Sequence, residues 1–239
     1  MLQHNSCQSL ANCVRKPSGF TSEQIHDFEA LLSPPRFGTY LRATGGDRDK
    51  AMALYCWNTE VSAAIYVMLQ FCELAIRNGA VEAIEAEFGP NWHLNVGFAA
   101  TLRTPRNGKG YQPRNDLKIN AERLPTAGKV VAELKFAFWQ GLFVKGQQAR
   151  IWDSQFARVF PGYEKSQTVA EARAHFYKQV DAVRKLRNRI AHHEPIFMRN
   201  LAEDRDRIRQ LRVDIRNKLK KSKKKSNSTK SRLMEKRQR

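Results

Sequence analysis

A cluster of basic and polar residues lies at the end of a predicted helix, in the stretch "KLRNRIAHHEPIF", residues 185–197. Helical periodicity runs through residues 168–193, and Pro195 ends it. Arg187 lies within the apolar stripe that Val183 and Ile190 continue. Arginine does not lose its charge, so this position requires a charged partner, a wet cleft or an interface. The cluster therefore predicts a use beyond packing.

Arg187, Asn188 and His192 have the chemistry needed to cleave RNA without a metal. An imidazole can take the proton from a ribose 2′-hydroxyl or give one to the leaving 5′-oxygen. A guanidinium can stabilise the negative charge that builds up on the phosphorus, and an amide can hold a non-bridging oxygen. The same residues also fit a buried ion pair and a cationic helix end, so residue types alone leave both interpretations open.

Helix geometry constrains how these side chains could act together. Asn188 and His192 are four residues apart and share a face, whereas Arg187 and His192 are separated by ~140°. Three arrangements could bring the second pair to one phosphate: the reach of the arginine chain, an unwinding of the last turn before Pro195, or a second protomer related by a two-fold axis. The helix dipole favours protonated imidazoles at His192 and His193.

Other site chemistries lack their sequence patterns. There is no HExxH, no paired CxxC, no serine–histidine–acid order and no phosphate-cradling glycine loop. The four cysteines, Cys7, Cys13, Cys56 and Cys72, have no pattern and fit free thiols in a reducing cytoplasm. The spacing of His4, Cys7 and Cys13 matches no familiar zinc site. We expect no metal and no cofactor.

The formal charge of +19 is concentrated at the C-terminus. Residues 216–239 hold twelve basic residues and one acidic residue, which is +11 and leaves +8 on residues 1–215. Such a surface predicts a polyanionic partner, with nucleic acid favoured over an anionic membrane. The lysine-rich tail should be disordered and should bind RNA without sequence preference. The lysines expected to do so are Lys220, Lys221, Lys223, Lys224 and Lys225.

The hydropathy pattern predicts an all-α chain with neither a signal peptide nor a transmembrane span, and so a cytoplasmic protein. We predict a flexible arm over residues 1–20, one helical domain over 21–215 and a disordered tail over 216–239. Residues 89–125 are expected to be mostly loop. The run "TAGKVVAELKFAFWQGLF", residues 126–143, is expected to be one central buried helix whose aromatic residues belong to the core. The other helices are expected from Thr21, around 37–43, over 47–88, around 115–123, and over 147–160, 168–193 and 200–220.

The string "LRNRIAHHEPIF" resembles the C-terminal signature of the Abi-like (abortive infection) proteins of bacteria, a branch of the HEPN superfamily marked by R-x-x-x-x-H. Three further blocks resemble the same family in the same order. They are "LYCWNTEVSAAIYVMLQFCELAIRNGAVEAI", "FGPNW" and "VVAELKFAFWQGLF". Together the blocks cover most of residues 47–197.

The resemblance implies a HEPN-type helical bundle, usually a homodimer, and for many members a metal-independent endoribonuclease that halts a phage-infected cell. It carries catalytic roles to Arg187, Asn188 and His192, and supporting roles to His193 and Glu194. Glu73, Arg77 and Asn78 match the earlier block, so the resemblance implies that they could form a supporting set. An intrahelical ion pair and a surface amide are the favoured explanation of these three residues. The long lysine-rich tail matches nothing in the family pattern.

A second function is open at this point. The chain could be a non-catalytic RNA-binding or regulatory module, in which the basic surface holds a small structured noncoding RNA and the Arg187–His192 pair is structural. Attachment to a membrane surface through the tail is disfavoured, because the tail has almost no apolar face.

Overall fold

The computed structural model describes residues 20–103, 105 and 110–211. None of these residues forms a β-strand, and most are helical, so the all-α prediction is confirmed for them. The predicted arm, except for its last residue, and the whole lysine-rich tail lie outside the described residues. The described residues form two compact units. Unit 1 comprises the residues up to Val67 together with Asn188–Leu201, and unit 2 comprises Met68–Arg187 together with the residues from Ala202 onward.

Unit 1 begins with α2, Ser22–Leu32, and α3, Pro34–Ala43. A capping box begins α2 where the sequence predicted a helix to start, because Thr21 Oγ1 accepts the N–H of Gln24 and the Gln24 side chain accepts the N–H of Thr21. Pro34 and Pro35 do more than follow α2, since they form the first turn of α3, where proline's missing N–H costs nothing. Gly45 and Gly46 then turn the chain with positive φ, as their position after the helix predicts.

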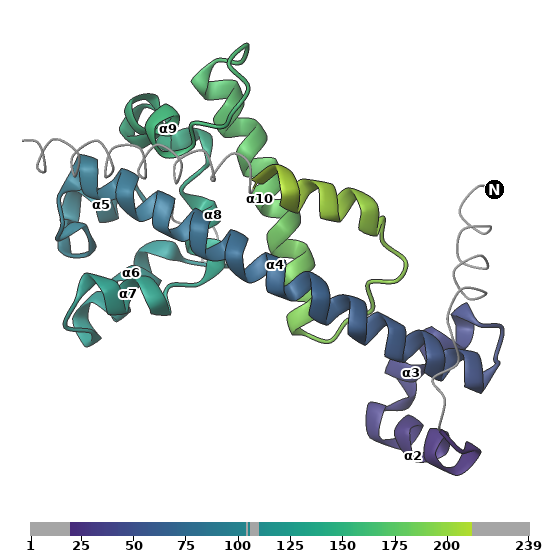
Figure 1. Cartoon of the computed structure of the whole chain (residues 1–239). Helices are drawn as coiled ribbons and strands as arrows, with labels where there is room; N and C mark the ends of the chain where they lie inside the picture. The colour runs from purple at the N-terminus through teal and green to yellow at the C-terminus, as the bar shows by residue number, and fades with distance from the viewer. Residues whose placement is uncertain (1–19, 104, 106–109, 212–239) are drawn as a thin grey trace, which may run out of the picture. The chain divides into compact units, whose positions relative to one another are not determined.

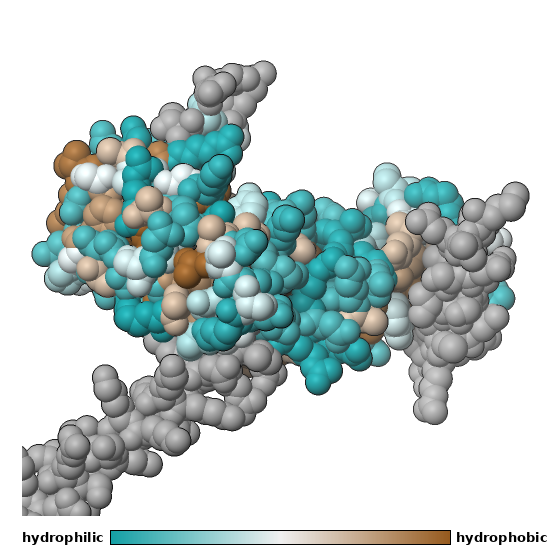
Figure 2. All heavy atoms as spheres, turned by 90° about the horizontal axis from the view of Figure 1, so that it is seen from above, coloured by the Kyte–Doolittle hydropathy of each residue, from teal (hydrophilic) through white to brown (hydrophobic). Residues whose placement is uncertain are grey.

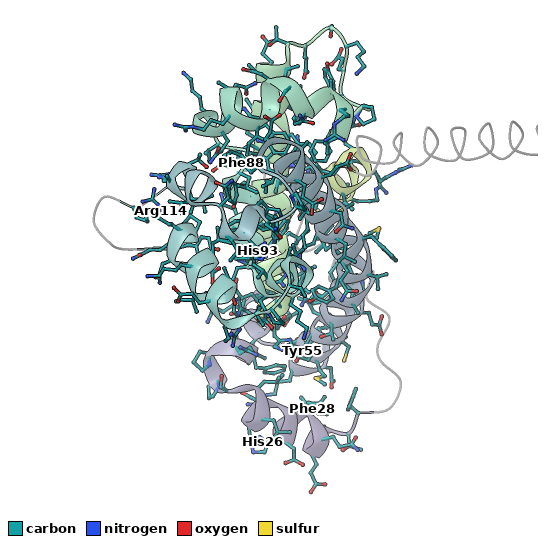
Figure 3. All side chains as sticks on the ribbon, turned by 90° about the vertical axis from the view of Figure 1, so that its left-hand side faces the viewer. His26, Phe28, Tyr55, Phe88, His93 and Arg114 are labelled. Atoms are coloured by element: carbon teal, nitrogen blue, oxygen red, sulfur yellow. The ribbon has the colours of Figure 1, made fainter. Side chains whose placement is uncertain are left out.

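The core of unit 1 joins α2, α3 and the first turns of α4, Arg48–Phe88, with a residue from far along the sequence, Phe197. Tyr40 lies at its centre, with its ring centroid 5.3 Å from that of Tyr55 and 5.2 Å from that of Phe197. Phe28 and Tyr55, both labelled in Figure 3, pack against this cluster. The buried members are Ile25, Phe37, Tyr40, Ala51, Met52, Leu54 and Phe197.

Unit 2 holds the remaining helices (Figure 1). In chain order they are η1 (Trp92–Leu94), α5 (Val96–Thr101), α6 (Pro113–Arg123), α7 (Ala127–Glu133), α8 (Phe136–Gly141), η2 (Lys145–Gln147), η3 (Gln148–Trp152) and α9 (Asp153–Val159). Helix α10, Val169–Ala191, contributes its first nineteen residues, to Arg187. A final helical run covers residues 201–211 and belongs to unit 2 from Ala202 onward.

Aromatic side chains form most of the core of unit 2. The rings of Phe143 and Trp152 stack with centroids 4.4 Å apart, and Phe160 and Phe176 lie 4.5 Å apart. Phe136, Phe138, Trp139 and Phe143 are all buried, which confirms that they belong to the core.

The prediction of one central helix over residues 126–143 is wrong. The backbone is extended at Leu134 and Lys135, so the run divides into α7 and α8. The indole of Trp139 donates to the carbonyl of Leu134 at 3.3 Å, which satisfies a buried oxygen that the interrupted helix leaves without its usual partner. Apolar residues on every side of this run favour the break, because two short helices can bury residues that one straight helix would present in opposite directions.

Residues 89–125 hold more helix than expected, namely η1, α5 and an α6 that begins at Pro113. Arg114, labelled in Figure 3, fixes the end of α5 by donating to the carbonyls of Ala99, Ala100 and Leu102 at 2.8–3.2 Å. This tertiary cap explains why a six-residue helix is stable where the sequence alone predicted loop.

Two parts of the described chain are notably hydrophobic, helix α4 and the region around α5. By length and composition only, α4 is long and apolar enough to cross a membrane, a test that the core helix of a soluble protein also passes. In unit 2, Figure 2 shows hydrophobic residues at the left-hand end of the view, where Figure 1 places α5. Leu94 and Val96, at 62% and 82% exposure, belong to this part of the chain.

We predict that Gly79→Ala destabilises the protein. A Cβ at residue 79 would lie 2.8 Å from the Phe160 ring and 3.0 Å from Val159, both of which are buried. Overpacking of this kind costs about 1–3 kcal/mol and outweighs the better helix propensity of alanine. Gly128→Ala in α7 is the control, because nothing lies within 4 Å of its Cβ position. Equal unfolding free energies for the two variants in urea would show that Gly79 does not lie against Val159 and Phe160.

Candidate functional site

The charge of Arg187 is balanced by Glu73 on α4. Arg187 Nε lies 3.3 Å from Glu73 Oε2, while Glu73 Oε1 accepts from Arg77 Nη2 at 2.9 Å. The side chain of Glu73 is 13% exposed and that of Arg187 is 33% exposed. The intrahelical Glu73–Arg77 pair is as the sequence predicted, but the same carboxylate also pairs with Arg187. Asn78, the third member of the supporting set, is exposed.

A second group of charges lies one to two turns earlier on α10. Asp181 pairs with Arg184 at 3.1 Å and with Lys185 at 2.7 Å, and it accepts the Gln140 side-chain N–H at 2.8 Å. Burial would raise the pKa of Asp181, but hydrogen bonds from Lys185 and Arg184 hold that pKa below its ordinary value. The carboxylate is thus ionised near neutral pH and restrains two basic side chains.

In unit 1, the end of α10 is a well-formed Schellman motif. The His193 N–H donates to Ile190 O at 3.0 Å, and the Glu194 N–H donates to Arg189 O at 2.8 Å. His193 has φ of 56°, the left-handed conformation that glycine usually occupies at this position. The His192 N–H still donates to Asn188 O at 2.9 Å, so the helix stays regular up to His192. The last turn is not unwound ahead of His192, and that route to a shared phosphate is removed.

The chain after the Schellman motif is held at two further points. Arg189 donates to the carbonyl of Pro195 at 2.9 Å and lies 3.4 Å from the Glu194 carboxylate. Asn58 is 5% exposed, and its Oδ1 accepts the N–H groups of Ile196 at 2.8 Å and Phe197 at 3.2 Å. These contacts fix the direction in which the chain leaves His192 and His193.

The sequence reasoning missed Arg189 and Asn58. Neither residue had a motif to mark it, because their partners are backbone groups that lie six and about 140 residues away. An asparagine among the apolar residues of a long helix was the one available signal, since a buried amide needs partners.

The predicted site residues differ in their surroundings. His192, His193 and Glu194 are exposed, whereas Asn188 is half-buried. Arg187 and the supporting residues of α4 belong to unit 2, and the motif from Asn188 onward belongs to unit 1. The lysines of the tail lie outside the described residues. Among the residues that are described, no group of three or more His, Cys, Asp and Glu side chains could hold a metal ion. Cys56 and Cys72 are not joined to another cysteine.

Comparison with known proteins identifies no relative of this chain. No protein-family model matches the chain, and neither a curated protein nor a solved structure does so.

His193→Gly should stabilise the protein by about 0.5–1 kcal/mol, because glycine adopts φ of 56° without the steric cost of a Cβ. The same change at His175, an exposed position within α10, should instead cost about 0.5 kcal/mol through the lower helix propensity of glycine. Urea unfolding of both variants measures the difference. A destabilised His193→Gly variant would contradict the Schellman geometry.

Asn58→Ala should release the segment after α10, because it leaves two buried N–H groups without an acceptor at roughly 1–3 kcal/mol each. Amide hydrogen exchange should accelerate specifically at Ile196 and Phe197. Asn58→Asp retains an acceptor oxygen and serves as the control. Unchanged protection of both amides in Asn58→Ala would rule out the proposed anchor.

Proposed function

We propose that this protein is a metal-independent endoribonuclease of the Abi-like, HEPN type, acting as an effector of bacterial antiphage defence in the cytoplasm. The observation that supports it most is the end of α10. An exposed histidine, His192, follows a firmly held helix terminus, and five residues earlier Arg187 carries a charge held by Glu73. A histidine and an arginine supply the two functions that support metal-free RNA cleavage, proton transfer and stabilisation of the charge on the phosphate.

The proposed reaction is attack of a ribose 2′-oxygen on the adjacent phosphorus. A His192 imidazole takes the 2′-hydroxyl proton or delivers a proton to the departing 5′-oxygen. The bond from phosphorus to the 5′-oxygen breaks as the bond to the 2′-oxygen forms, which leaves a 2′,3′-cyclic phosphate and a 5′-hydroxyl. Arg187 stabilises the charge on the non-bridging oxygens, and Asn188 donates to one of them.

Glu73 is proposed to orient Arg187 without neutralising the site. Its carboxylate is shared by two guanidinium groups, Arg77 and Arg187, so the three side chains together keep one positive charge. A phosphate therefore meets a net cation whose position is already fixed. His193 and Glu194 support His192 through the turn that follows it, since both donate the backbone hydrogen bonds of the Schellman motif.

We also propose that the active form is a homodimer. A regular helix through His192 keeps Arg187 and His192 about 140° apart around the axis. With unwinding removed, the reach of the arginine side chain and a second protomer remain as ways to bring both groups to one phosphate. A two-fold axis would place two copies of each residue around one cleft.

One observation favours the alternative, a non-catalytic RNA-binding module. The Arg187–Glu73 pair is the arrangement expected of a structural arginine in a half-buried position. In that case the basic surface and the lysine-rich tail would hold RNA, including a small noncoding RNA, without cutting it. Measured cleavage separates the two functions directly.

His192→Ala should abolish RNA cleavage while leaving the melting temperature within a few degrees, because an exposed side chain contributes little packing. Gel analysis of a labelled RNA, in buffer with EDTA, measures cleavage and should reveal 2′,3′-cyclic phosphate ends. His175→Ala is the matched control, since His175 is exposed on α10 but lies outside the motif. Cleavage that persists in His192→Ala would refute the nuclease assignment.

The same assay tests the dimer when two inactive variants are mixed. Arg187→Ala and His192→Ala protomers should together regain part of the activity if each site takes groups from both chains. A mixture with no activity, in a protein that sediments as a monomer of 27.5 kDa, would contradict the dimer.

A further inference from the structure

Unit 2 contains a cavity of about 270 Å³ that no step of the proposed reaction uses. It is lined by segments far apart in the sequence, among them Arg103, Tyr111, Phe138, Gln140 and Tyr177. Its volume is just below the roughly 300–1,000 Å³ typical of sites for drug-sized ligands. A cavity of this size suits a single small ring system.

Three aromatic residues, Tyr111, Phe138 and Tyr177, belong to the lining of the cavity. Phe138 is buried. Tyr111 and Tyr177, which lie far apart in the sequence, are both half-buried. The Tyr111 hydroxyl donates to Asp116 at 2.6 Å, and burial together with this carboxylate raises the pKa of Tyr111. The phenol therefore stays neutral and keeps one orientation. Aromatic walls of this kind stack planar rings, nucleobases included.

The walls are held in place before any ligand binds. Arg114 fixes the carbonyl of Leu102, and Gln147 donates to the Thr101 carbonyl at 3.0 Å. Gln140 is 7% exposed and donates to Asp181 through Nε2 at 2.8 Å. One of the two N–H groups of Nε2 is thereby engaged, so Gln140 can offer a ligand its amide oxygen and its second N–H, and both can pair with groups on a base edge.

The surroundings of the cavity are basic. Arg103 lines the cavity and is exposed. The Lys135 ammonium lies 5.8 Å from the centre of the Tyr111 ring. Arg184 and Lys185 follow Tyr177 by about two turns on α10, and both pair with Asp181. Four basic side chains thus accompany two carboxylates, those of Asp181 and Asp116, so the surroundings keep a net positive charge. A ligand with a planar ring and an attached anion matches both the walls and the charge.

We infer that this cavity binds one unpaired nucleobase of the RNA, as a recognition subsite on α10 separate from the cleavage chemistry. The inference rests on the proposed function, since it takes RNA as the substrate. Tyr177 precedes Arg187 by ten residues, which is about 15 Å along the helix axis. An RNA strand bound at both places would present a base to the cavity and a phosphate to Arg187, so the cavity would select which phosphate is cut.

The test uses the full-length protein and short single-stranded 2′-O-methyl RNAs, which lack the attacking hydroxyl and cannot be cut. Fluorescence anisotropy measures their binding across a range of salt. Loss of one stacked base costs about 1–3 kcal/mol, so Tyr177→Ala should weaken binding by about 5- to 150-fold. The slope of affinity against salt should not change, because no phosphate contact is lost.

Three further variants make the result specific. Tyr177→Phe keeps the ring and should bind as the wild type does. Ala137→Leu, which adds volume to the lining, should reproduce the loss without removing an aromatic residue. Tyr163→Ala is the matched control, because Tyr163 is half-buried and lines a different cavity of unit 2. It should bind normally.

The inference is overturned if Tyr177→Ala and Ala137→Leu bind these RNAs as tightly as the wild type, or if Tyr163→Ala loses as much affinity as they do. Binding of free indole in the cavity, with no competition from nucleoside monophosphates, would overturn it in favour of an uncharged aromatic ligand. Failure of the nuclease proposal is separate: it would appear as cleavage by His192→Ala, while uncleavable RNA still reports on the cavity.

Discussion

The carboxylate of Glu73 accepts ion pairs from two guanidinium groups, one on its own helix and one on α10. A half-buried arginine on an apolar stripe is costly unless a counter-charge removes most of its desolvation penalty. Glu73 supplies that charge, and its own position is fixed by Arg77 one turn later. The candidate site depends on this pair, because Arg187 could not otherwise remain within the packed face of α10. The net cation of the three side chains is also what a phosphate would meet.

The other half of the motif depends on backbone hydrogen bonds and not on charge. The Schellman motif places a non-glycine residue, His193, in the left-handed region, and Arg189 and Asn58 then hold the chain that follows. Strained backbone of this kind persists only where its surroundings determine it strongly. The backbone that carries the two exposed imidazoles is therefore held in one position. A catalytic histidine needs such a fixed position, whereas an ordinary surface histidine does not.

If RNA is the ligand, as proposed, the cavity near Tyr177 and the motif near Arg187 would make two different kinds of contact with one strand. The cavity offers aromatic side chains and a buried amide, and the motif offers cationic donors for phosphate. Stacking tolerates salt, whereas phosphate contacts weaken as counterions compete. A helix that carries both would separate recognition of a base from the chemistry at the neighbouring phosphate.

The sequence by itself determined the all-α class, the helix start at Thr21, the long helical run over residues 47–88 and the aromatic core, because these follow from local periodicity and hydrophobicity. It also singled out Arg187 as a charge in need of a partner. It could not name Glu73 as that partner, divide the helix at Leu134 or find Asn58, since each depends on groups that only the folded chain brings together. Periodicity describes one element at a time, whereas ion pairs, caps on buried carbonyls and cavities arise between elements, and the tertiary structure alone decides them.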